Sequence, residues 1–170
     1  MAKRKILTDG DPALRKICKP VDKFNLRLHL LLRDMADTMY DADGVGLAAP
    51  QVGILRRAVV IDVGDGLVEL VNPVILSASE ETQTGREGCL SVPGRAGIVT
   101  RPMRVKVRAQ DRNGAWFELE AEELFARAVC HELAHLDGQL YTDIMDRELT
   151  REELEAEARE QEAAAAEEKA

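Results

Sequence analysis

The order of hydrophobic patterns along the chain predicts an α+β fold in which antiparallel strands pack around a central helix. Residues 24–40 and 122–136 each place apolar side chains at helical spacing, and alternating or β-branched runs lie between them. The last residues are rich in Ala and Glu, which predicts a C-terminal helical tail. We therefore expect an N-terminal helix, a set of strands, a second helix and a tail.

The stretch 24–40 is amphipathic, because its apolar side chains recur every three or four residues. Asp22 is the expected N-cap, and Asp43 with Gly44 is expected to end the helix. Residues 44–53 then combine glycines with a proline, which predicts a loop whose backbone approaches a ligand closely.

Two β-branched runs, residues 58–63 and 68–76, are the first predicted strands. Asn72 and Pro73 interrupt the second run, which predicts a sheet edge or a bulge at that point. Residues 82–97 contain four glycines, so we expect them to form a loop.

Residues 105–121 carry a strong hairpin signal. Apolar and polar residues alternate on both sides of the segment 111–114, Asp-Arg-Asn-Gly, and Asn-Gly supplies the positive φ angles of a tight turn. The helix that follows is expected to end at Asp137, with Gly138 as its C-cap.

Length and composition fit one domain, with 170 residues of which 45% are hydrophobic and 32% charged. We expect residues 1–147 to form this single domain and residues 148–170 an acidic tail, helical near Leu154 and frayed beyond Gln161. Residues 147–170 hold 9 acidic and 4 basic side chains, so they supply −5 of the net charge of −8.

Composition also limits the partners and the location. No apolar run approaches the roughly 20 residues of a membrane helix, and no signal-peptide core follows the basic start. We therefore expect a cytoplasmic protein without a membrane partner, and the net charge of −8 argues against DNA. Three scattered cysteines favour free thiols or metal ligands over disulfides.

The segment 131–135 reads His-Glu-Leu-Ala-His, and two histidines four apart on a helix differ by about 40° around its axis. Both rings can therefore reach one metal ion. Glu132 lies about 60° from His135, where it can handle the protons of a water molecule without being a ligand. The alternative is a pair of surface histidines, which we disfavour because two of only three histidines lie here.

A catalytic metal site needs a third protein ligand and an open position, and Cys89 is the best candidate. It lies in the segment 87–91, Glu-Gly-Cys-Leu-Ser, where glycine lets the backbone hold a thiolate toward a metal. Cys130 points about 100° away from His131 on the helix. Cys18 has no supporting motif, so we expect both to be small buried hydrophobes.

Three motifs follow one another in a fixed order: residues 44–51 (Gly-Val-Gly-Leu-Ala-Ala-Pro-Gln), residues 87–91 and residues 131–135. In order and spacing they resemble the peptide deformylase family, and the resemblance covers about residues 4–148. The residues after the second motif are most similar to the branch found in many bacteria and in organelles, which implies a bacterial cytoplasmic enzyme.

The resemblance implies metal-dependent hydrolysis of the N-formyl group from the N-terminal formyl-methionine of nascent polypeptides, with release of formate. Cys89, His131 and His135 would bind the metal, typically Fe²⁺, with Zn²⁺, Ni²⁺ or Co²⁺ as substitutes. A metal held in this way lowers the pKa of water toward neutrality. Glu132 would be the general base that passes the proton to the leaving amine.

The resemblance also assigns the substrate contacts. Gln51 and the backbone N–H of Leu90 would hold the formyl oxygen, and one such donor is typically worth ~3 kcal/mol in the transition state. An extended peptide would bind like an added strand, with its methionine in an apolar pocket. The implied substrate-binding residues are Val45, Gly46, Gly88, Leu124 and Ala128. Without the resemblance, the glycines are plain turn residues and Gln51 is a loop polar residue.

Ala134 departs from the family, which usually has Asp at this position. The change is expected to remove a supporting polar contact and to weaken metal retention. Glu87 and Arg101 resemble an ion pair of the family that would brace the Cys89 loop, although as isolated residues both are simply solvated charges. Arg127 is expected to reach the rim of the methionine pocket.

Formyl-methionyl nascent peptides are the implied partners, and a transient ribosome contact is compatible with that role. In some relatives a basic C-terminal helix docks on the ribosome. The tail of this chain is acidic and ribosomal RNA is a dense polyanion, so we predict that the tail does not anchor to it.

Two other functions fit part of the pattern. A zinc endopeptidase shares the HExxH segment but takes its third ligand downstream, where Glu153 and Glu155 are the only well-spaced candidates. Cys89, upstream in its own motif, argues against it. A non-catalytic ribosome-associated or metal-storing protein with a degenerate site is supported only by Ala134.

Overall fold

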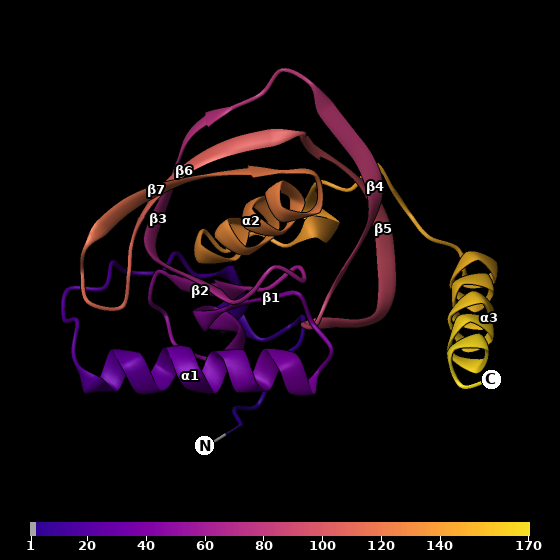
Figure 1. Cartoon of the computed structure of the whole chain (residues 1–170), viewed down its shortest axis with the longest axis horizontal. Coiled ribbons are helices and arrows are strands. Elements are labelled where there is room, and N and C mark those ends of the chain that lie inside the picture. Colours follow the sequence, from indigo (N-terminus) through magenta and orange to yellow (C-terminus); the bar gives the residue numbers. More distant parts are fainter. Residues whose placement is uncertain (1–2) are drawn as a thin grey trace.

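The computed structural model describes residues 3–170 and folds them into two antiparallel sheets and three α-helices (Figure 1). The strand order is β1-β2-β3-β6-β7 in one sheet and β4-β5-β8 in the other. The strands are β1 Gly46–Ala48, β2 Ala58–Ile61, β3 Val68–Ala78, β4 Thr82–Cys89, β5 Val92–Pro102, β6 Arg104–Gln110, β7 Trp116–Glu122 and β8 Arg147–Glu148. The α-helices are α1 Leu26–Asp41, α2 Glu123–Leu136 and α3 Arg151–Glu168. The predicted α+β class, its antiparallel strands and its N- and C-terminal helices are confirmed.

Strand β2 is buried on both faces, which explains its continuous β-branched run. Because side chains alternate along a strand, Val59 and Ile61 enter the hydrophobic cluster that contains the apolar stripe of α2. Val60 enters the cluster that contains the stripe of α1. In Figure 1 the two helices accordingly lie on opposite sides of β1 and β2.

The start of α1 and the end of α3 differ from expectation. Asn25, and not Asp22, caps α1, and its side chain accepts a hydrogen bond from the Leu28 amide. Helix α3 continues to Glu168 instead of fraying beyond Gln161.

The expectation of a loop over residues 82–97 is wrong, because β4 and β5 form a long hairpin there. Pairing runs from Thr82 opposite Pro102 to Cys89 opposite Val92. Ladder hydrogen bonds along this hairpin outweigh the low strand propensity of its glycines. Strand β3 has the predicted bulge at Asn72, where φ is 50° and the register shifts, but it lies inside the sheet and not at its edge.

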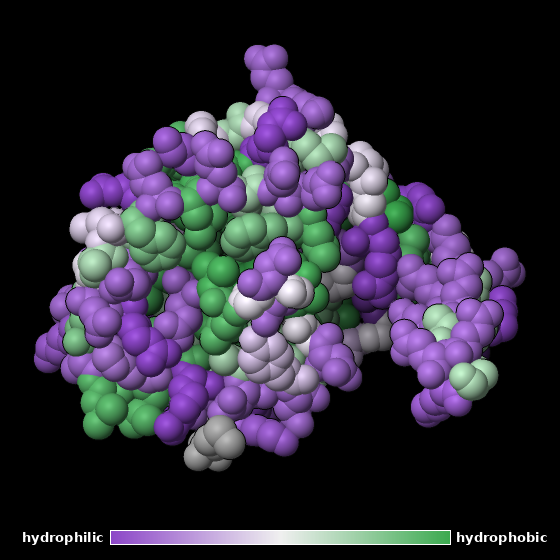
Figure 2. Space-filling model, in the orientation of Figure 1, coloured by the Kyte–Doolittle hydropathy of each residue, from purple (hydrophilic) through white to green (hydrophobic). Residues whose placement is uncertain are grey.

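The tail helix α3 stands on the outer side of the β4–β5 hairpin, where Glu157 pairs with Arg86 of β4 (Figure 1). It has no buried residue, and Figure 2 shows that its surface is mainly hydrophilic. Leu149, just before the helix, is buried in the body. Across residues 3–170, no helix has both the length and the apolarity needed to cross a bilayer.

Candidate active site

His131 and His135 lie on one side of helix α2 because they are four residues apart. The opposite stripe of α2, with Val129 and Leu136, is packed in the core cluster and fixes the rotation of the helix. Both histidines are buried, at 8% and 1% exposed, so they are not surface histidines.

Strand β4 faces this side of α2. Residues two apart on a strand share a face, so Glu87 and Cys89 both point at the helix. The β4–β5 register shifts between these two residues and leaves Gly88 without a Cα partner. Such a bulge ends regular pairing and frees the backbone of the unpaired residue for other contacts.

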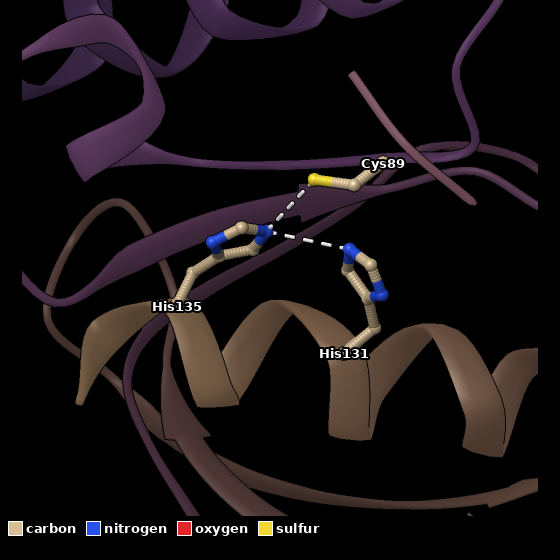
Figure 3. A group of neighbouring side chains, drawn as sticks. All are labelled: Cys89, His131 and His135. Atoms are coloured by element: carbon tan, nitrogen blue, oxygen red, sulfur yellow. Dashed lines mark hydrogen bonds between the residues drawn. The ribbon is translucent and has the colours of Figure 1, made fainter. Parts of the chain in front are cut away.

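The donor atoms of Cys89, His131 and His135 all lie within 4.8 Å of one another. Figure 3 shows the thiol and the two rings pointing toward a common point from β4 and α2. The Nε2 atom of His135 is 3.4 Å from Cys89 Sγ and 3.3 Å from His131 Nε2. Two nitrogens bound to one tetrahedral ion at about 2.0–2.1 Å lie about 3.3 Å apart, so the spacing fits a metal ion.

Glu87 fixes the orientation of His131. The Nδ1–H of His131 donates to Glu87 Oε1 at 2.6 Å, which turns Nε2 toward the cluster. Burial works to raise the pKa of Glu87, but hydrogen bonds from His131 and Arg101 outweigh it and lower this pKa to about 2. Glu87 is therefore a fixed negative charge behind the cluster.

The surroundings of Cys89, His131 and His135 favour positive charge at this point. Burial opposes a charge on His131, yet hydrogen bonds to Cys89 and Glu87 raise its pKa to about 10 in the protein alone. A divalent cation supplies positive charge at this point, so the donor set and its electrostatics both fit a metal.

Glu132 is 4% exposed, and its Oε2 atom has no hydrogen-bond partner within residues 3–170. Burial raises the pKa of Glu132 to about 7, against the opposing effect of His131. A buried carboxyl with such a pKa can both take and return a proton near neutral pH. A Cβ on Gly46 would lie 2.5 Å from Glu132 Oε1, so Gly46 is needed for close approach and not for a turn.

Gln51 is held with its amide nitrogen toward Cys89. The Ala48 amide donates to its Oε1 at 2.9 Å, and Nε2 donates to Ser91 Oγ at 3.0 Å and lies 3.6 Å from Cys89 Sγ. The side chain is 1% exposed, so the amide is a preset donor.

A cavity of ≈ 470 Å³ opens onto these groups. It contains nearly every residue that the sequence predicts for the site. These are Val45, Gly46, Gln51, Gly88, Cys89, Leu90, Leu124, Ala128, His131 and Glu132. His135 lies behind them as the most buried member of the metal cluster.

Arg127 lines the cavity, as predicted, but as a buried side chain and not at an exposed rim. Its guanidinium is buried and donates to Glu87 Oε2 at 2.7 Å and to the Val99 carbonyl at 2.9 Å. Arg101 donates to the same carboxylate at 2.7 and 3.1 Å. The predicted Glu87–Arg101 pair is thus present and buried, and Arg127 makes it a cluster.

Sequence reasoning missed two residues of the site. Ser91 accepts a hydrogen bond from Gln51, and Tyr141 stacks on His131 with ring centroids 6.1 Å apart. Ser91 belongs to the Glu-Gly-Cys-Leu-Ser motif, which is a usable signal, whereas nothing in the local sequence marks Tyr141. Ala134 lines a separate groove with Arg57 and Arg101, away from the metal cluster.

A thiol and two imidazoles beside a buried carboxyl, at a cavity in an α+β fold, are typical of metal-dependent hydrolases. Residues 3–151 match the family model described as polypeptide deformylase. The chain belongs to this family, whose function is metal-dependent deformylation and whose members are hydrolases that act on N-formyl peptides.

Relatives and solved structures that are similar to this chain are also peptide deformylases. The chain is 59% identical over 155 residues to a peptide deformylase of Caldicellulosiruptor bescii, which covers 91% of this chain and 93% of that protein. The crystal structure of the Thermotoga maritima peptide deformylase superposes with a TM-score of 0.85 at 45% identity, over 86% of this chain and 99% of that one. A Synechococcus elongatus peptide deformylase in complex with actinonin has a TM-score of 0.81 at 39% identity, over 92% of this chain and 88% of that one.

Glu153 and Glu155, the candidate third ligands of an endopeptidase site, form ion pairs with arginines instead. Glu153 binds Arg147 at 2.9 Å, and Glu155 binds Arg151 at 3.1 Å, both on exposed surface around α3. Cys89 occupies the third position beside the histidines instead.

Proposed function

We propose that this chain hydrolyses the N-formyl group of formyl-methionyl nascent peptides and releases formate. The observation that carries the proposal is the convergence of Cys89, His131 and His135 beside Glu132 at one cavity. Membership of the polypeptide deformylase family supports it.

Cys89, His131 and His135 would hold the metal on the central helix α2 and strand β4. We propose Fe²⁺ as the native ion, with Zn²⁺, Ni²⁺ or Co²⁺ as substitutes, because a thiolate with two imidazoles suits these ions. When bound, the ion supplies Lewis acidity and lowers the pKa of water. Glu87 keeps His131 in the tautomer that ligation needs.

Glu132 is the proposed general base and then acid. Its unpaired Oε2 takes a proton from the attacking water, and the same carboxyl gives the proton to the departing amine. Gln51 Nε2 and the Leu90 amide would hold the formyl oxygen as it becomes negative.

The peptide would lie extended along the cavity. The backbone of Val45 and Gly46 on one side and of Gly88 on the other would hydrogen-bond it, as in strand addition. Ala128 and Leu124, about one and two turns before His131 on α2, would contact the methionine side chain.

The division of the chain into domain and tail, and its location, are also proposed. We propose residues 1–147 as one catalytic domain and 148–170 as an acidic tail that does not anchor the enzyme to ribosomal RNA. A bacterial cytoplasmic location accords with the bacterial relatives. Salt-sensitive pelleting with ribosomes that is lost on removing residues 148–170 would contradict the proposal for the tail.

The function is tested by amine release from formyl-Met-Ala-Ser, using protein prepared without oxygen and loaded with Fe²⁺. We expect turnover by the native chain, and neither turnover nor one equivalent of metal in Cys89→Ala. Cys130→Ala is the matched control, because Cys130 is outside the cluster. Absence of turnover by native protein with one equivalent of bound metal would contradict the proposal.

Ala134→Asp tests the departure from the family. Asp at this position would lie in the groove shared with Arg101, whose partner Glu87 orients His131. We expect slower loss of iron to a chelator, by about tenfold, as for other groups that support metal ligands. Equal iron loss from both proteins would show that Ala134 does not limit metal retention.

A further inference from the structure

Two arginines line the mouth of the active-site cavity, and the acidic tail segment supplies a carboxylate to each. Arg86 Nε lies 3.1 and 3.2 Å from the two carboxylate oxygens of Glu157 on α3. Arg95 pairs with Glu148 on β8. Both arginines therefore form ion pairs with glutamates of the acidic tail, residues 148–170.

Arg86 lies beside the proposed path of the peptide. A Cβ on Gly88 would be 3.2 Å from Arg86 Nη1, so the guanidinium lies against the unpaired bulge residue. The exposed acid at the mouth, Asp43, lies next to Gly44 and Val45, which belong to the opposite wall. The β4 wall of the mouth therefore presents a cation to whatever occupies the cavity beyond methionine.

The ion pair between Arg86 and Glu157 is weak enough for another carboxylate to take the place of Glu157. The two side chains are 50% and 31% exposed, and ion pairs in such surroundings are weak and screened by salt. Helix α3 has no buried residue that would hold Glu157 in place by packing. A carboxylate on a bound peptide can therefore replace Glu157 at small expense in free energy.

We propose that Arg86 selects peptides with an acidic side chain shortly after the formyl-methionine, and that Glu157 competes with that side chain. This inference rests on the proposed deformylase function. The tail then acts as an internal competitor that moderates the charge preference of the site without touching the reacting atoms.

The test is steady-state deformylation by the Fe²⁺-loaded full chain. The peptides are formyl-Met-Ala-Ser and peptides with Glu, Gln or Lys at the second or third position. For the wild type we expect kcat/KM for Glu to exceed that for Lys by about three- to fivefold at one of these positions. The difference should lie in KM and should shrink at high salt.

Two variants separate the parts of the proposal. Arg86→Gln should bring the Glu/Lys ratio to about 1, whereas Glu157→Gln should raise it by about two- to threefold, because the competitor is lost. Arg104→Gln and Glu160→Gln are matched controls that remove charge away from the mouth, and the ratio should stay at its wild-type value.

The outcomes are distinguishable. A ratio unchanged by Arg86→Gln, with formyl-Met-Ala-Ser still turned over, overturns the selectivity proposal and leaves the deformylase function standing. A ratio lost in Arg86→Gln but unchanged in Glu157→Gln overturns the competitor role of the tail. No turnover of any peptide overturns the proposed function and this inference together.

Discussion

Helices α2 and α3 both have charged side chains around them, but those near α2 are buried and those near α3 are exposed. Around α2, Glu87, Arg101, Arg127 and His131 form one buried cluster in which each charge has a partner. Around α3, Arg151 and Glu155 form an isolated pair, 92% and 53% exposed. The buried charges hold His131 of the candidate active site in place, whereas the exposed ones lie on a helix that has no buried residue.

Glu153 near α3 and Glu87 near α2 have the same lowered pKa, but for different physical reasons. The pKa of Glu153 falls to about 2 because Arg147 and the Thr150 amide hydrogen-bond it, yet its surroundings are solvent. The pKa of Glu87 also falls to about 2, but against the effect of burial. Water replaces the partners of Glu153 when they leave, and nothing replaces those of Glu87.

The largest expected effect of a single change is that of Glu132→Gln, which removes the buried carboxyl that we propose as the proton carrier but keeps the shape of the side chain. We expect kcat to fall by roughly 10²–10⁴-fold, with unchanged metal content and thermal midpoint. The matched control Glu155→Gln on α3 should keep full activity. A loss below tenfold in Glu132→Gln would remove Glu132 from its proposed role.

Glu87→Gln tests the buried cluster through stability. The change leaves two guanidiniums buried without their counter-charge, so urea denaturation should show a loss of about 3–5 kcal/mol in the free energy of unfolding. Metal affinity should fall as well, because His131 loses its carboxylate partner. A loss below 1 kcal/mol would place this cluster with the exposed pairs of the tail.

Gly46→Ala should disturb the site by direct contact. Its Cβ would meet Glu132 Oε1 at 2.5 Å, and we expect about 1–3 kcal/mol lower stability, together with reduced kcat. Gly88→Ala is the comparison, because its Cβ would meet only the movable end of Arg86 at 3.2 Å. Equal stability losses in the two variants would show that the contact with Glu132 is not what requires glycine.

The smallest effect is expected on α3. Arg151→Gln removes an exposed i,i+4 pair, so the free energy of unfolding should change by about 0.3–0.5 kcal/mol or less. Thermal denaturation with and without salt checks this. A change above 1 kcal/mol would show that α3 shares in the cooperative unit of the body.

Local pattern predicted much of the fold, because periodicity and turn chemistry act over a few residues. The β6–β7 hairpin is where alternation and Asn113-Gly114 place it, but of these two turn residues only Gly114 has a positive φ, of 87°. Helix α2 ends at Leu136 with Gly138 at φ 75°. The β4–β5 hairpin was predicted as a loop because its stability comes from pairing between distant residues, and a glycine-rich stretch carries no local sign of that.

The same distinction applies to the site. The spacing of His131 and His135 within one helix is enough to predict that they share one side of it. The Glu-Gly-Cys-Leu-Ser motif was enough to predict Cys89 as the third member of the cluster. The burial of Arg127 on Glu87 was not predictable, because it depends on how β4 lies against α2. The ring of Tyr141 reaches His131 for a similar reason, through a turn whose position no local pattern specifies.

The double coverage of β2 has a consequence for native-state dynamics. Amide hydrogens of Val59 and Val60 exchange with solvent only when α1 and α2 separate from the sheet, which amounts to global unfolding. Helix α3 can open without disturbing either cluster. In deuterium the tail should therefore label within the first time points and β2 last, so limited proteolysis should trim the chain from its acidic end while the cavity stays intact.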